Sequence, residues 1–208
     1  MKVLLFNGSP HKDGCTYTAL TEIAGTLEAC GISTEIIQIG SKPFHGCMAC
    51  GKCSETGSCV FGEKDGLNSI LQKCAEADGF VFGSPVYYAS ANGTLVGFMD
   101  RLFYSGSQHL AHKPAAAIVS ARRGGTTASF DVLNKYFTIN QMPIVSSTYW
   151  NMVHGSCADD VAKDQEGLQT MRNLGLNMAW LLQCIDAGKR AGIHPPQAER
   201  DHCTNFIR

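Results

Sequence analysis

The chain has little net charge and no long apolar run. Its 208 residues carry 17 Lys and Arg against 18 Asp and Glu, a formal net charge of −1 at pH 7. This balance argues against a broad basic surface for nucleic acid or anionic lipid, and weakly against an acidic carrier that docks by charge alone. No apolar stretch approaches the ~20 residues of a membrane span. The short N-terminal run, Val3 to Phe6, has no small-residue cleavage site after it, so we expect a strand and a cytoplasmic protein.

The chain also lacks internal repeats and low-complexity linkers, and strand patterns alternate with helix patterns instead. The segments with strand character are 2–6, 34–39, 80–82, 115–119 and 144–149, and those with helical periodicity are 16–30, 67–74, 93–104, 129–141 and 166–191. Such alternation predicts a doubly wound α/β domain, a parallel sheet with helices on both faces. We expect one domain over 1–191, with a cysteine-rich loop at 44–62 and an extended tail at 192–208.

The loop after the first expected strand lacks the signatures of three common ligand-binding loops. Gly8 and Gly14 are too widely separated for G-x-G-x-x-G, and they are one residue too far apart for a Walker A loop, in which Lys would stand where Cys15 stands. Asn7 replaces the acidic residue that a phospho-receiver domain needs at this place. A monophosphate remains as the ligand, and FMN ends in one.

What this loop does contain suits an anion. Free backbone N–H groups and the helix dipole at the start of the following helix attract negative charge. Ser9 and Thr16 add hydroxyl donors, and His11 or Lys12 adds positive charge. The alternative is a plain helix N-terminus capped by Thr16, with nothing bound.

The segment GSPHKDGCT resembles the phosphate loop of the NAD(P)H-dependent FMN reductase and iron–sulfur flavoprotein family, which usually reads GSP-[basic]-x-x-[GS]-[NS]-T. The positions that match its phosphate-binding residues are Ser9, His11, Gly14, Cys15 and Thr16. His11 replaces the commoner Arg, and Cys15 the commoner Asn or Ser. The resemblance implies a flavodoxin-like five-stranded parallel sheet of order 2-1-3-4-5. It covers residues 1–150 well and the rest thinly, although the ending 204–208 also resembles the family.

The loop after the third strand offers groups for a flat ring. A flavin needs an apolar or aromatic face and backbone groups at its pyrimidine edge. The segment resembles the family's S-P-V-Y motif beside the isoalloxazine, and its candidate residues are Pro85, Val86, Tyr87, Tyr88 and Asn92. The alternative is a surface turn with incidental tyrosines.

The loop after the fourth strand is rich in glycine and arginine. Its candidate cofactor-binding residues are Ser120, Arg122, Arg123, Gly124 and Gly125. Glycines allow close backbone approach, and an Arg can offset charge on a reduced flavin. The alternative is a glycine turn with solvated arginines. The loops after strands one, three and four meet at the switch point of a 2-1-3-4-5 sheet, which favours one shared site.

Ten cysteines are many for a chain of this length, and four of them crowd together. Cys47, Cys50, Cys53 and Cys59 follow the spacing C-x2-C-x2-C-x5-C. This spacing can converge on one [4Fe–4S] cluster, and it is similar to the cluster motif of iron–sulfur flavoproteins. Zinc, reduced thiols and a local disulfide remain alternatives.

These features predict an FMN-dependent oxidoreductase with no catalytic side chain, since the flavin carries the chemistry. Electrons would pass through FMN to a quinone, a second flavin or an iron–sulfur partner. The donor would be ferredoxin-like if a cluster is present and NAD(P)H if it is not. A non-catalytic flavodoxin-type carrier and a thiol or metal redox sensor are the alternatives. The resemblance further implies a homodimer or homotetramer.

Overall fold

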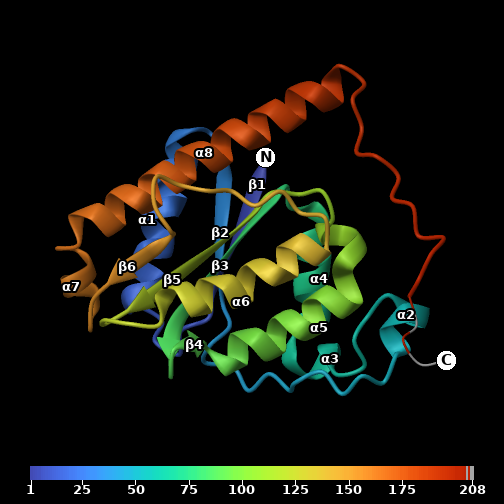
Figure 1. Ribbon diagram of the computed structural model, residues 1–208, viewed down its shortest axis with the longest axis horizontal. Coiled ribbons are helices and arrows are strands. Elements are labelled where there is room, and N and C mark those ends of the chain that lie inside the picture. Colours follow the sequence, from blue (N-terminus) through green and yellow to red (C-terminus); the bar gives the residue numbers. More distant parts are fainter. Residues whose placement is uncertain (205, 207–208) are drawn as a thin grey trace.

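A parallel β-sheet runs through the centre of the computed structural model, which describes residues 1–204 and 206 (Figure 1). The strands are β1 (Lys2–Asn7), β2 (Ser33–Gln38), β3 (Gly79–Tyr87), β4 (Ser90–Ala91), β5 (Ala115–Ala121) and β6 (Met152–His154). The sheet order is β2-β1-β3-β5-β6, and β4 pairs antiparallel with the end of β3. Apart from β4, this is the predicted order, so the predicted fold class is confirmed. Residues 205, 207 and 208, within the predicted tail and ending, lie outside the described part of the chain.

Helices cover both faces of the sheet (Figure 1). They are α1 (Cys15–Ala29), α2 (Lys52–Thr56), α3 (Gly62–Asp65), α4 (Leu67–Glu76), α5 (Gly93–Leu110), α6 (Thr126–Ile139), α7 (Ala158–Val161) and α8 (Gln165–Arg190). Residues of α1 and α8 share one hydrophobic core with the sheet, and residues of α4, α5 and α6 share the other. Within the described residues no helix combines the length and apolar character that crossing a membrane requires.

The alternation of side chains along β1 explains the two cores. Leu4 and Phe6 face α4, α5 and α6, whereas Val3 and Leu5 face α1 and α8. Successive side chains of a strand point to opposite faces, so a strand covered on both sides is apolar at every position. The ring of Phe6 stacks on that of Phe82 in β3, with centroids 4.7 Å apart, which joins the two central strands.

The predicted fifth strand, 144–149, is wrong. Only its first residues reach the sheet: Ile144 forms an isolated bridge with Ala115, and the Val145 N–H donates to the Ala115 carbonyl at 2.8 Å. The chain then leaves the edge and returns as β6, which pairs with residues 119–121 of β5. The strand that completes the sheet therefore begins eight residues later than predicted.

Hydrogen bonds to α8 hold the intervening segment away from β5. The Ser147 hydroxyl donates to the Thr170 carbonyl at 2.7 Å, and the Asn177 amide donates to the Ser146 carbonyl at 2.8 Å. The chain rejoins at Asn151, whose side-chain amide donates to the Ala117 carbonyl at 3.0 Å. Polar residues in a β-branched run thus bond to a helix instead of a strand, and strand propensity alone does not show this.

Buried Cys74 of α4 gives the fold a testable pH dependence. Burial raises the pKa of its thiol from 9.0 to about 12, against a smaller opposing effect of Lys113. Above pH 9 the unfolded chain releases the thiol proton while the folded chain keeps it, so the free energy of unfolding falls as pH rises. Between about pH 9 and pH 11, we expect the free energy of unfolding of the wild type to fall with rising pH more steeply than that of Cys74→Ala. The difference between the two slopes should be up to about 1.4 kcal/mol per pH unit.

Urea denaturation with a thiol reductant, repeated across this range, measures the difference. The control is Cys184→Ala, which replaces an exposed thiol and should retain the wild-type alkaline loss. Parallel pH profiles for the wild type and Cys74→Ala would contradict the expectation.

Candidate functional site

An open cleft of about 850 Å³ lies at the carboxyl ends of the sheet strands. It is lined by the loops after β1 and β6, residues 9–16 and 155–158, and by the carboxyl ends of β3 and β5 with the residue that follows β5, residues 85–87 and 120–122. Ligands of open α/β sheets bind at this edge, where neighbouring strands send their connections to opposite faces. The structure thus brings the three predicted loops together, and it adds a fourth.

The fully buried side chain of Asn7 organises the first loop. Its carbonyl oxygen accepts the Ser9 N–H at 3.1 Å, and its amide donates to the His11 carbonyl at 3.3 Å and to Gln38 Oε1 at 2.7 Å. The Gln38 amide in turn donates to the Ser9 carbonyl at 2.6 Å. Asn7 and Gln38, at the ends of β1 and β2, therefore fix the path of the loop backbone. Sequence reasoning used Asn7 only to exclude a receiver domain.

The loop leads into α1, whose first turn opens on the cleft. Gly14 is the N-cap of α1 and has no side chain with which to cap its N–H groups. Thr16 is buried, and its hydroxyl lies 2.8 Å from that of Ser120, which joins the first and third loops. His11 and Lys12 line the cleft with exposed side chains. The arrangement presents backbone donors, a helix dipole and positive charge to one place.

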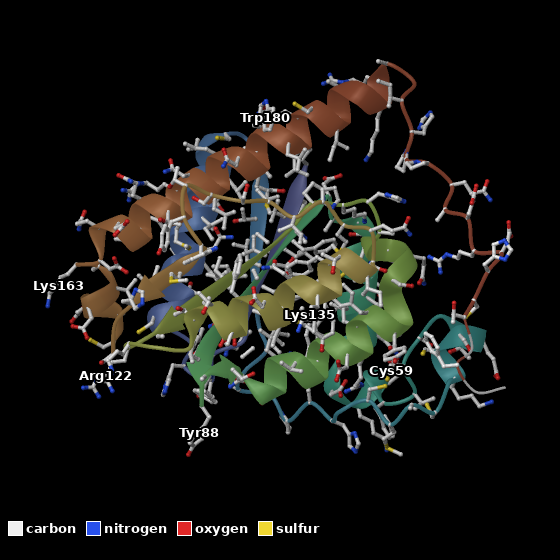
Figure 2. The ribbon with its side chains drawn as sticks, viewed as in Figure 1. Cys59, Tyr88, Arg122, Lys135, Lys163 and Trp180 are labelled. Carbon is white, nitrogen blue, oxygen red and sulfur yellow. The ribbon has the colours of Figure 1, made fainter. Side chains whose placement is uncertain are left out.

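The second loop contributes only part of its predicted set. Pro85, Val86 and Tyr87 line the cleft. Tyr88 does not: it is fully exposed and points away from the protein (Figure 2). Asn92 is buried as the N-cap of α5, where its side chain accepts the Thr94 and Leu95 N–H groups. Asn92 therefore anchors the helix that follows the loop and does not face the cleft.

The third loop is divided in the same way. Ser120 and Arg122 line the cleft, whereas Arg123, Gly124 and Gly125 are not among its lining residues. Gly125 is the N-cap of α6 at a φ of +90°, and a Cβ there would lie 2.6 Å from the Ala89 Cα. This glycine allows α6 to begin against the β3–β4 turn, which is a structural role.

Sequence reasoning missed the fourth loop, 155–158. It follows the true β6, and it was missed because the fifth strand was expected earlier in the chain. Had β6 been recognised, the small residues Gly155 to Cys157 would have indicated it. The Cys15 thiol lies 3.5 Å from the Gly155 carbonyl. Burial raises the pKa of Cys15, and nearby Cys157 and Asp160 act in the same direction.

The four clustered cysteines line a second, smaller cavity of about 150 Å³. Cys47 and Cys50 are exposed, Cys53 and Cys59 are half-buried, and all four thiols are free. Among the residues that the structure describes, no three or more His, Cys, Asp or Glu side chains are grouped to hold a metal ion. In Figure 2, Cys59 lies on the opposite side of the view from Arg122 of the cleft.

Arg101 of α5 forms one wall of this cavity and was not expected from the sequence. It is 2% exposed, and its guanidinium pairs with Asp65 of α3. Burial opposes its charge, but hydrogen bonds to Asp65 and Cys59 outweigh burial and raise the pKa of the guanidinium above its ordinary value. The sequence signal for a buried ion pair was a single Arg within the apolar pattern of this helix.

Comparison with known proteins identifies the family of this chain. The sequence profile of the family described as NADPH-dependent FMN reductase matches residues 1–156. This chain belongs to that family. An iron–sulfur flavoprotein of Methanocaldococcus jannaschii is 33% identical over 194 residues, which cover 89% of this chain and 99% of that protein. The chain is accordingly a flavin-dependent oxidoreductase, as the sequence predicts.

Solved structures of other proteins share the fold of this FMN reductase family member. RosB with a bound 8-demethyl-8-formylriboflavin-5'-phosphate intermediate aligns with a TM-score of 0.69 at 14% identity, over 100% of this chain and 92% of that one. A flavodoxin from the domain Archaea aligns with a TM-score of 0.59 at 14% identity, over 88% of this chain and 99% of that one. At these identities the likeness concerns the fold alone.

The role of Asn7 in this family member can be tested by Asn7→Ala. The substitution leaves the buried Ser9 N–H and Gln38 Oε1 without their Asn7 partner, so we expect a loss of about 1–3 kcal/mol in the free energy of unfolding. Thr21→Ala, which removes one exposed hydroxyl bonded within α1, is the control and should cost less than about 0.5 kcal/mol. Urea denaturation measures both. Equal small losses would show that Asn7 does not organise the loop.

Proposed function

We propose that the cleft binds FMN with its phosphate at the start of α1. The uncapped first turn of α1, which opens on a cleft lined by all four loops, is the observation that carries this proposal. Backbone N–H groups at a helix N-terminus bind phosphate without a specific side chain. Lys12 and His11 would add charge, and Thr16 and Ser9 lie beside the same turn. The cleft also falls in the size range of cofactor sites, about 300–1,000 Å³.

The remaining loops would hold the ring. Pro85 to Tyr87 provide an apolar and aromatic wall, and Ser120 at the end of β5 and Arg122 just after it line the cleft. Bound FMN would supply hydride and single-electron transfer through its ring system, so the protein needs no nucleophile or base of its own. The task of these residues is to bind the ring, to orient it and to place positive charge beside it.

We further propose that Cys47, Cys50, Cys53 and Cys59 hold a [4Fe–4S] cluster. Their donor set fits, because the four thiols are free and line one cavity, whose other lining includes the apolar side chains of Met48, Val60 and Phe61. In such a cluster each thiolate ligates a different iron, so the sulfurs need not approach as closely as they would around a single ion. The name of the Methanocaldococcus relative supports the same reading. A cluster favours a ferredoxin-like protein, which passes one electron at a time, as the partner.

The phosphate contact can be tested with FMN and riboflavin, which differ only in the phosphate. Lys12→Gln removes an exposed cation at the loop, so we expect the Kd for FMN to rise about three- to tenfold while that for riboflavin stays the same. Lys135→Gln, on α6 (Figure 2) and outside the cleft lining, is the control and should leave both constants unchanged. Titration of apoprotein by flavin fluorescence measures them. An equal change for both ligands in Lys12→Gln would contradict the placement of the phosphate.

The cluster can be tested by anaerobic reconstitution followed by iron analysis and an absorption spectrum. We expect flavin bands, a broad shoulder between them and about four irons per chain. Cys59→Ser should lower the iron content and leave FMN bound, whereas Cys184→Ser, at an exposed cysteine outside the loop, should retain both. A reconstituted wild type without iron would overturn the cluster proposal and leave the FMN proposal intact.

A further inference from the structure

Arg101 is a buried cation to which the proposed functions give no role. It is the largest of the fully buried side chains and lies on α5 among apolar neighbours. Burying a guanidinium is unfavourable unless its N–H groups and its charge find partners. The identity of those partners therefore indicates what the residue does.

All of these partners lie within residues 45–65, here called the cysteine segment, which carries the four clustered cysteines. Arg101 Nε donates to Cys59 Sγ at 3.3 Å, and Nη1 donates to the His45 carbonyl at 3.1 Å. Nη2 donates to Asp65 Oδ1 at 3.2 Å, and Nη1 contacts the other carboxylate oxygen. The guanidinium thus links α5 to both ends of the cysteine segment and presents one N–H to a single sulfur.

Cys59 is also held by its backbone, unlike the exposed Cys47 and Cys50. Its N–H donates to Asn68 Oδ1 at 3.0 Å. Its carbonyl accepts from the Asn68 amide at 3.1 Å and from the Gly62 N–H at 2.8 Å. With the Arg101 contact, both the main chain and the sulfur of Cys59 are fixed. Cys59 is the cysteine whose position depends least on a bound cluster.

We propose that Arg101 is a positioning residue that fixes Cys59 as the anchoring ligand of the cluster, and that Arg101 and Asp65 shift the reduction potential of that cluster in opposite directions. The inference rests on the proposed cluster. It assigns opposite effects on the reduction potential to Arg101 and Asp65. A purely structural ion pair would not have these effects.

The direction of each effect follows from charge. One-electron reduction adds one negative charge at the cysteine site and makes or breaks no bond; in a titration the electron comes from dithionite. A cationic N–H directed at a ligand sulfur stabilises the more negative, reduced state and raises the potential. The Asp65 carboxylate, on the Nη side of the guanidinium, opposes this through its own charge.

The experiment compares the midpoint potential of the cluster in reconstituted full-length protein for the wild type, Arg101→Gln, Arg101→Lys and Asp65→Asn. Dithionite titration followed by electron paramagnetic resonance measures it. For Arg101→Gln we expect the ratio of reduced to oxidised cluster at a fixed potential to fall about tenfold, a shift of about −59 mV for one electron. Arg101→Lys should shift it less in the same direction, and Asp65→Asn should shift it upward.

Lys113→Gln is the matched control. Lys113 is a half-buried cation whose ammonium group donates to the Cys74 and Ala75 carbonyls at 2.8 and 3.1 Å, at the end of α4. Its removal takes one positive charge from the same domain without touching the cysteine segment. It should leave the potential at the wild-type value, and bound FMN reports that each variant is folded.

The outcomes separate the two proposals. Loss of iron from Arg101→Gln with FMN retained supports the positioning role, and Arg101→Lys and Asp65→Asn then decide the effect on potential. Wild-type potentials in all iron-loaded variants, or shifts of the same sign for the Arg101 and Asp65 variants, overturn the inference while the cluster proposal stands. A wild type that binds no iron overturns the cluster proposal itself.

Discussion

The cleft depends on the close approach of the backbones at the ends of β1 and β3. The Gly8 N–H donates to the Gly83 carbonyl at 2.8 Å, and a Cβ on Gly8 would lie 2.7 Å from that oxygen. A Cβ on Gly83 would lie 2.8 Å from Thr16 Cγ2. Only glycines permit this spacing without displacement of one of the loops. Because the two loops leave the sheet in contact, the first turn of α1 lies against β3, and Thr16 reaches Ser120 on the next strand.

The sequence predicted the fold class and three of the four loops, since alternating apolar runs and turn residues are local signals. It could not predict which loop residues face the cleft. Asn92 and Gly125 lie in loops of the right composition, but the structure uses them to begin α5 and α6. A polar residue or a glycine before a helix fits capping and ligand contact equally well, so only tertiary placement separates the two roles. The fourth loop was missed for a different reason. The β-branched residues Ile144, Val145 and Thr148 placed the expected strand too early, whereas residues 146–148 bond to α8.

For the cysteine segment, too, the sequence does not predict how the individual residues are placed. The spacing of four cysteines indicates a common ligand, yet it does not distinguish the exposed Cys47 and Cys50 from Cys59, whose main chain and sulfur are both hydrogen-bonded. That difference arises from Asn68 and Arg101, nine and forty-two residues away. Long-range contacts of this kind have no local sequence signal. A charged residue inside an apolar helix pattern is the trace that they leave, because a buried charge requires partners elsewhere in the chain.

Helix α5 connects the cleft with the cysteine cavity. Its N-cap, Asn92, is tied to β3, the strand whose last residues line the cleft, since the Asn92 N–H donates to the Ser84 hydroxyl at 2.8 Å. Arg101 lies nine residues farther along, about 13.5 Å at 1.5 Å per residue. The only non-helical residue within α5, Gly106, comes after Arg101, so the intervening turns are regular. The cysteine segment is bonded to this helix through Arg101 at both of its ends. Its position relative to the cleft is therefore set by a regular helix whose N-cap is bonded to β3, and not by the loop that carries the thiols.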